Sequence, residues 1–146
     1  MTIKDKIQKY CAYQERSPQE VHNKLIAFHC PEEELNVIFQ SLIQDDFLNE
    51  KRYIASFIQG KINTKGWGKN KLRFELKRKG ISEKQITHYF NQIPDITFKN
   101  SLKEHYTKWL KTNELNQKTY PKLMRYLMSK GYTLDEIRTT IKDIDY

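Results

Sequence analysis

Apolar residues recur along this chain at steps of three and four positions, with charged and amide side chains between them. This spacing is typical of amphipathic α-helices, whereas a half-buried strand alternates apolar and polar residues. Glycine and proline, 5 and 4 in 146 residues, interrupt the pattern rarely. The sequence therefore predicts an all-α protein. We expect helices over about residues 2–14, 18–28, 32–44, 50–63, 68–79, 83–93, 97–112, 118–130 and 134–144.

The helical pattern also repeats when the sequence is shifted by 51 residues. The shift superimposes four sets of positions, among others: Val21, Leu72 and Leu123; Leu25, Leu76 and Leu127; Cys30, Ile81 and Tyr132; Leu42, Ile93 and Ile144. A fixed period of this length indicates a repeat architecture, in which small units share apolar faces with their neighbours. We expect three tandem three-helix repeats, over residues 1–49, 50–95 and 96–146, in an elongated and curved array.

Local signals mark the same helix ends in successive copies. Ser17 precedes a proline, a combination that favours a helix start. Ser82 and Thr133 each precede a Gln or Glu by three positions, which is the signature of a capping box. Gly80 and Gly131 stand two residues before them and are expected to end the preceding helices in a backbone conformation with positive φ.

The charge is unevenly distributed. The net charge of +8 comes from 26 Lys and Arg against 18 Asp and Glu, and residues 1–50 contribute only 5 of the basic residues and 9 of the acidic ones. In the helix over residues 68–79, Leu72 and Leu76 define the side expected to be buried, with three cations in a row beside it and two on the other flank. The candidate contact residues for a polyanion or an acidic protein surface are Arg52, Lys61, Lys65, Lys69, Lys71, Arg73, Lys77 and Arg78. The alternative interpretation is a solvated helix face without a partner.

Two aromatic residues lie among these cations. Trp67 is flanked by Gly66 and Gly68, and we interpret it as a structural anchor, with stacking on a ligand as the alternative. Phe74 projects away from the leucines, so it either packs on an adjacent helix or contacts a partner.

Catalytic and metal-binding patterns are not evident in the sequence. The four histidines and two cysteines show no metal-ligand spacing and no activating neighbour, and no Walker or dinucleotide-binding motif is present. We therefore expect no enzyme activity, no metal and no cofactor. The sequence also lacks a signal-peptide pattern and a long apolar run, so we expect a cytoplasmic protein that does not associate with membranes. We further expect the protein to be a monomer.

Three ordered segments of the chain match known family motifs. The most specific is GWGKNKLRFELKRKGI, residues 66–81, which fits G-[YW]-G-x-x-[KR]-[IL]-x-x-E-L-x-x-K-G-[IV]. The others are RSPQEVHNKL at residues 16–25 and NEKRYIASFI at residues 49–58. With these segments the chain resembles the RecX family, bacterial regulators of the recombinase RecA. The last segment departs from the family pattern, since Asn49-Glu50 replaces an acidic pair and Ile54 replaces alanine.

The resemblance implies an array of three-helix repeats and a non-enzymatic function. A protein of this family is expected to lie in the groove of the RecA–DNA filament and to inhibit ATP hydrolysis, strand exchange and coprotease activity by RecA. Its partners would be the RecA filament and DNA, the latter without sequence preference. A basic helical module that binds DNA or RNA by itself is the alternative function.

Overall fold

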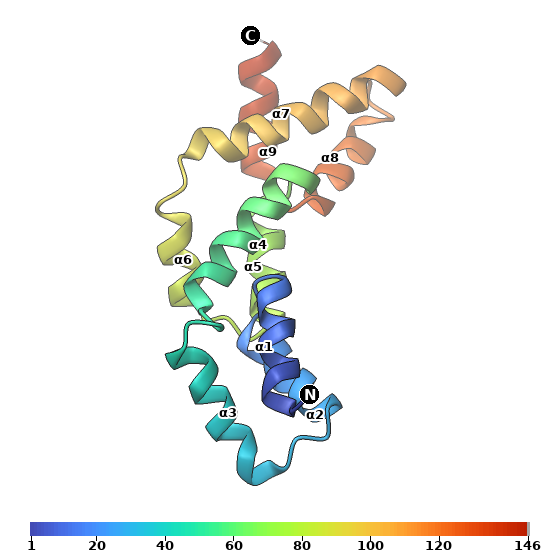
Figure 1. Ribbon diagram of the computed structural model, residues 1–146. Helices are drawn as coiled ribbons and strands as arrows, with labels where there is room; N and C mark the ends of the chain where they lie inside the picture. The colour runs from blue at the N-terminus through green and yellow to red at the C-terminus, as the bar shows by residue number, and fades with distance from the viewer. Residues whose placement is uncertain (146) are drawn as a thin grey trace. The chain divides into compact units, whose positions relative to one another are not determined.

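The computed structural model describes the backbone of residues 1–145 and the side chains of residues 1–143, and over this range the chain is helical without strands (Figure 1). The predicted all-α class is therefore confirmed. Of the positions in the 51-residue pattern, Ile144 lies outside the described side chains. The helices of residues 1–145 are α1 (Ile3–Tyr13), α2 (Pro18–Ala27), α3 (Glu32–Gln44), α4 (Glu50–Lys65), α5 (Lys69–Arg78), α6 (Glu83–Phe90), α7 (Asp95–Thr112), α8 (Tyr120–Ser129) and α9 (Leu134–Asp145).

The predicted helix limits differ most from the structure between α6 and α7. Helix α6 ends at Phe90 rather than at residue 93, and α7 begins at Asp95 rather than at residue 97. Pro94 accounts for both differences, because it holds an extended backbone before α7 and disfavours the helical conformation in the residue that precedes it. The amides of Gln92 and Ile93 accordingly donate to carbonyls three positions back, as in a tight turn.

The predicted helix starts carry the expected caps, with one difference. The Thr133 hydroxyl accepts from the Glu136 amide, and the Glu136 carboxylate accepts from the Thr133 amide, which completes the capping box. The Ser82 hydroxyl also accepts from the Gln85 amide. The Gln85 side chain, however, contacts the Ser82 hydroxyl instead of its backbone N–H, so this box is incomplete.

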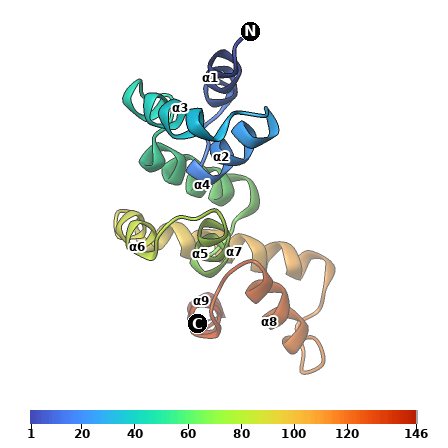
Figure 2. The same cartoon turned by 90° about the horizontal axis from the view of Figure 1, so that it is seen from below.

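The chain divides into two compact units. The first comprises Met1–Phe57 and Arg78–Ile81, and it contains α1, α2 and α3 (Figure 2). Helix α2 packs against both α1 and α3. The core residues of this unit include Ile7, Cys11, Val21, Leu25, Leu42 and Leu48. These units do not follow the three repeat borders expected from the sequence, and the three-repeat division stays a prediction.

The second unit comprises Ile58–Lys77 and Ser82–Tyr146. Its longest helix, α7, crosses α8 and α9 and packs against both (Figure 1). Leu72 and Leu76 of α5 are fully buried, as the sequence predicted. Other core residues of the unit are Leu102, Leu123, Leu127 and Ile137.

Within the second unit, the start of α5 is joined by backbone hydrogen bonds to the turn that follows α8. The Gly68 amide donates to the Lys130 carbonyl at 2.8 Å, and the Asn70 amide donates to the Gly131 carbonyl at 3.1 Å. The first amides of a helix and the last carbonyls of another lack partners within their own helices, so each end satisfies the other here. The opposite ends of the two helix dipoles also meet favourably.

Glycine is required on both sides of this joint. A Cβ on Gly68 would lie 2.5 Å from the Gly131 carbonyl oxygen, and a Cβ on Gly131 would lie 2.6 Å from the Lys71 Cβ. Gly131 also has φ of 107°, a conformation that residues with a Cβ rarely adopt. The glycines therefore permit a backbone approach that side chains would prevent.

Gly66 lies in the turn between α4 and α5, and its carbonyl forms hydrogen bonds with two residues from other parts of the unit. It accepts a hydrogen bond from the Tyr132 hydroxyl at 2.7 Å and one from His105 Nε2 at 2.9 Å. Burial raises the pKa of the Tyr132 hydroxyl, which therefore stays protonated and able to donate. The turn between α4 and α5 is thus fixed to α7 and to the start of α9.

A related junction occurs in the first unit, between the start of α2 and the end of α5. When the nitrogen of its side-chain amide faces the end of α5, Gln19 donates to the carbonyls of Arg78 and Lys79 at 3.0 and 3.3 Å. The Lys79 ammonium lies 3.9 Å from the Glu20 carboxylate. Gln19 and Asn70 are 51 residues apart, and so are Lys79 and Lys130, so the two junctions join corresponding helix ends. The hydrogen bonds come from the Gln19 side chain in the first unit and from backbone amides in the second.

We predict opposite effects for alanine at two glycines of this unit. Gly68→Ala should lower the free energy of unfolding by about 1–3 kcal/mol, because its Cβ overlaps the Gly131 carbonyl. Gly60→Ala is the matched control: a Cβ there meets nothing within 4 Å, so a helix-interior alanine should stabilise the protein by about 0.5–1 kcal/mol. Urea unfolding of the three proteins measures both changes. Equal stability of the Gly68 and Gly60 variants would contradict the tight joint.

Candidate functional site

The structure separates the eight candidate basic residues between the two units. Arg52 and Arg78 belong to the first unit, and the other six belong to the second. The Arg52 guanidinium pairs with Glu15 at 2.9 Å and with Asp46 at 2.8 Å, and it donates to the Asp46 carbonyl. These contacts give Arg52 a role in holding α4 to the preceding loops of its own unit.

The predicted row on α5 faces carboxylates of its own unit. Glu83, in the first turn of α6, accepts from Arg73 at 2.8 Å and lies 2.6 Å from the Lys77 ammonium. Lys69 lies 3.7 Å from a carboxylate oxygen of Asp95, at the start of α7. Sequence reasoning placed this row correctly beside the leucines, but one helix considered alone does not reveal which acids from other helices lie opposite it.

These two cations lower the pKa of the Glu83 carboxyl. The hydrogen bond from Lys77 is the largest cause that lowers the pKa of the Glu83 carboxyl, and the charges of Arg73 and Lys77 act in the same direction. The pairs remain accessible, since the side chains of Lys77 and Glu83 are about half exposed. Exposed ion pairs of this kind contribute little to stability, so phosphate groups could compete for the same cations.

A second group of cations surrounds Trp67. The ammonium groups of Lys61 and Lys71 lie 5.0 and 4.9 Å from its ring centroid, within the range of cation–π attraction. Lys71 also donates to the Ser129 carbonyl at 3.2 Å, which orients its side chain. We call Lys61, Trp67 and Lys71 the Trp67 cluster. Lys65, in the last turn of α4, is exposed two positions before the tryptophan.

Phe74 lies on the outer side of α5. Its side chain is 62% exposed, so packing on an adjacent helix does not account for most of its surface. An exposed aromatic ring near basic side chains is able to stack on an unpaired base. The exposure of Phe74 is thus compatible with the contact interpretation, which stays a prediction.

In the part of the chain that the structure describes, no helix is both long enough and apolar enough to span a membrane. The same residues contain no grouping of three or more His, Cys, Asp or Glu side chains with the arrangement of a metal site.

The ion pairs of Glu83 make a pH-dependent contribution that we expect to be measurable. Because the folded state lowers the pKa of this carboxyl, the pairs stabilise the protein above its ordinary value of 4.5, and their contribution is lost as the pH falls through the folded-state pKa. Glu83→Gln should therefore lower Tm near neutral pH and match the wild type in acid. Glu114→Gln, which removes an exposed carboxylate before α8, should leave Tm nearly unchanged. A Glu83→Gln deficit that persists at pH 3 would contradict this account.

Comparison with known proteins relates the chain to RecX proteins. A family model described as RecX, second three-helix domain, matches residues 49–88, which hold α4, α5 and most of α6. A relative from Clostridium tetani, named regulatory protein RecX, is 27% identical, and the aligned region covers 90% of this chain and 62% of the relative's length. Another of that name, from Clostridium botulinum, is 30% identical over 88% of this chain and 61% of its own.

The fold agrees with these sequence matches. The crystal structure of RecX from Lactobacillus salivarius superposes with a TM-score of 0.85 at 24% identity, over 98% of this chain and 94% of the other. The chain spans about half to three fifths of the length of the first curated relatives that it matches. The three motifs, the family match over residues 49–88 and the shared fold agree, and all of them make the chain similar to RecX proteins.

Proposed function

We propose that this chain is a non-enzymatic regulator that binds in the groove of the RecA–DNA filament and inhibits RecA ATPase, strand exchange and coprotease activity. The observation that carries the proposal is the chain's similarity to proteins named regulatory protein RecX over 90% of its length. The family motif at residues 66–81 forms the joint and the basic helix α5, so the most specific part of the resemblance coincides with the candidate site.

Charge supports a filament that contains DNA as the partner. The protein carries a net charge of +8, and its basic excess lies outside the first 50 residues. Basic side chains that replace counterions on phosphates give binding that weakens steeply with salt and depends little on sequence. Electrostatic attraction would also speed the encounter with the filament.

We assign the contacts with phosphate to two sets of residues in the second unit. The first set is Lys65 and the Trp67 cluster, whose cations are exposed or half-exposed and lie close to an aromatic ring or two positions before it. Arg73 and Lys77 are held by Glu83 and would exchange that carboxylate for phosphate on binding. Arg78, which is exposed at the end of α5 and belongs to the first unit, is proposed as a further phosphate contact.

Inhibition by such a protein requires differential affinity. A bound regulator shifts the filament among its states only as far as its affinities for those states differ. We propose that this chain binds best to a filament state that hydrolyses ATP slowly, which would restrain the ATPase without any chemistry by the regulator itself.

The second candidate function is binding to DNA or RNA without RecA. The exposed ring of Phe74 among the cations of α5 favours it, because aromatic stacking and phosphate contacts suffice to bind single strands. Comparable affinity for naked DNA and for RecA-coated DNA would support this function over the first.

The direct test is an ATPase assay with the recombinase of the same organism. RecA on single-stranded DNA should lose most of its ATPase activity at amounts of this protein equal to or below those of RecA. Full activity in the presence of a large excess would refute the proposed function.

Neutralising two cations should weaken binding to the filament. The double variant Lys61→Gln and Lys65→Gln should bind RecA-coated DNA several-fold more weakly and with a shallower salt dependence, because two phosphate contacts are removed. The double variant Lys4→Gln and Lys9→Gln, on exposed positions of α1, changes the net charge equally and serves as control. Biolayer interferometry over a salt series measures both. Equal losses in the two variants would indicate an effect of net charge alone and would move the interface away from Lys61 and Lys65.

A further inference from the structure

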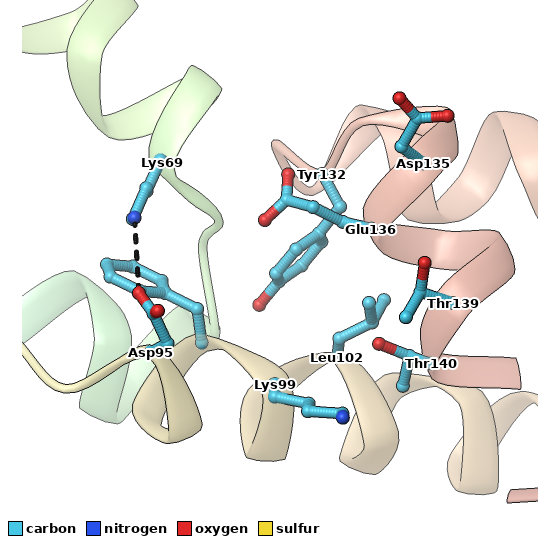
Figure 3. Close-up of a pocket in the computed structure, with 10 residues that line it drawn as sticks. Lys69, Asp95, Lys99, Leu102, Tyr132, Asp135, Glu136, Thr139 and Thr140 are labelled. Atoms are coloured by element: carbon cyan, nitrogen blue, oxygen red, sulfur yellow. Dashed lines mark ion pairs between the residues drawn. The ribbon is translucent and has the colours of Figure 1, made fainter. Parts of the chain in front are cut away.

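A pocket in the second unit lies beside the basic helix but differs from it in chemistry. It encloses about 340 Å³ between the start of α5, α7 and α9 (Figure 3). Its apolar lining comes from Phe98, Leu102 and Tyr132. A concave site with an apolar lining and a few converging polar groups is the usual form of a binding pocket.

The charges of the pocket favour a cationic occupant. Three carboxylates line it, on Asp95, Asp135 and Glu136, together with two lysines. Both lysines are paired, since Lys69 lies 3.7 Å from Asp95 and Lys99 lies 2.6 Å from Asp143, outside the lining. Among the described residues no ion pair engages Asp135 or Glu136. A phosphate would therefore meet excess negative charge here, in contrast to the Trp67 cluster.

Lys69 already shows how the pocket holds a cation. Its ammonium lies 5.4 Å from the centroid of the Phe98 ring and points to the Asp95 carboxylate (Figure 3). An aromatic ring and a carboxylate on one cation form a recurring recognition site for ammonium and guanidinium groups. The pair is loose and easily replaced, because the Asp95 side chain is 99% exposed and the contact is long for an ion pair.

We propose that this pocket receives one arginine or lysine side chain from a basic segment of the partner protein. The incoming side chain takes the place of Lys69 beside Phe98 and Asp95, and the carboxylates of Asp135 and Glu136 add to its binding. Arginine fits best, because its planar guanidinium stacks on a ring and pairs with two carboxylates at once. Displaced from the pocket, Lys69 becomes available to the anionic partner of α5.

The proposal rests on the proposed function for the identity of the partner, which is the recombinase in its filament. It divides the second unit into a surface for nucleic acid and a pocket for protein. Engagement of the pocket would release one more cation toward DNA, so protein and DNA contacts would reinforce each other.

The pocket can be tested without any recombinase. N-acetyl-arginine amide is titrated into the ¹⁵N-labelled protein, and N-acetyl-citrulline amide, which has the same shape without the charge, serves as the control ligand. We expect amide shifts at the starts of α7 and α9 and at Tyr132 with the arginine compound and much smaller shifts with the citrulline compound. Equal responses to the two compounds, or shifts confined to other regions, would overturn the proposal.

Two variants decide whether the pocket charges act as proposed. The double variant Asp135→Asn and Glu136→Gln should weaken arginine binding about two- to fivefold or more, which corresponds to one or two exposed ion pairs. The glutamine introduced at position 136 can still accept the hydrogen bond from the Thr133 backbone amide at the start of α9. Lys69→Met removes the internal cation at similar length and should tighten arginine binding by a similar factor. Unchanged affinity in both variants would contradict the proposal.

A filament experiment separates this proposal from the proposed function. If both hold, the Asp135→Asn and Glu136→Gln variant binds RecA-coated DNA more weakly while its affinity for naked DNA does not fall. If the wild-type protein does not bind the filament, the proposed function fails, and the arginine titration still decides the pocket. Wild-type affinity of the variant for the filament would show that the partner does not use the pocket.

Discussion

The backbone pairing between the start of α5 and the turn after α8 is the constraint on which the second unit depends. The amides of Gly68 and Asn70 donate to two carbonyls of that turn, so backbone groups at the two helix ends provide hydrogen-bond partners for each other. The approach is possible only because Gly68 and Gly131 have no Cβ. Packing of the backbone therefore explains the second glycine of the GWG sequence, and the half-buried Trp67 lies close to the ammonium groups of two lysines.

The fixed position of α5 determines how its cations are used. One side of the helix is turned toward Glu83 and Asp95, where Arg73, Lys77 and Lys69 find carboxylates within the same unit. The other flank carries Lys71 next to Trp67. The basic residues of this helix therefore have different surroundings: Lys69, Arg73 and Lys77 face carboxylates of neighbouring helices, and Lys71 lies beside an aromatic ring and the Ser129 carbonyl.

The same joint places Tyr132 and the first turn of α9 beside Lys69, which creates the pocket with carboxylates and aromatic rings. In the proposed scheme, Lys69 belongs to both sites: it fills the pocket when the protein is free and joins the basic surface when a partner's cation replaces it. Such an exchange of one ion pair for another costs little, because exposed pairs are weak and the Asp95 carboxylate keeps a cationic partner in both states.

The sequence by itself determined the all-α class, most helix limits, the caps at Ser17 and Thr133, and the buried leucines of α5, because these depend on local propensity and on the period of apolar residues. It also indicated the RecX family through three ordered motifs. Only the tertiary structure decided which lysines and arginines face acids and where a pocket forms. The physical reason is that an ion pair or a cavity requires groups from helices far apart in sequence, such as Lys69 with Asp95 or Tyr132 with Gly66, and helical periodicity carries no information about which helices meet.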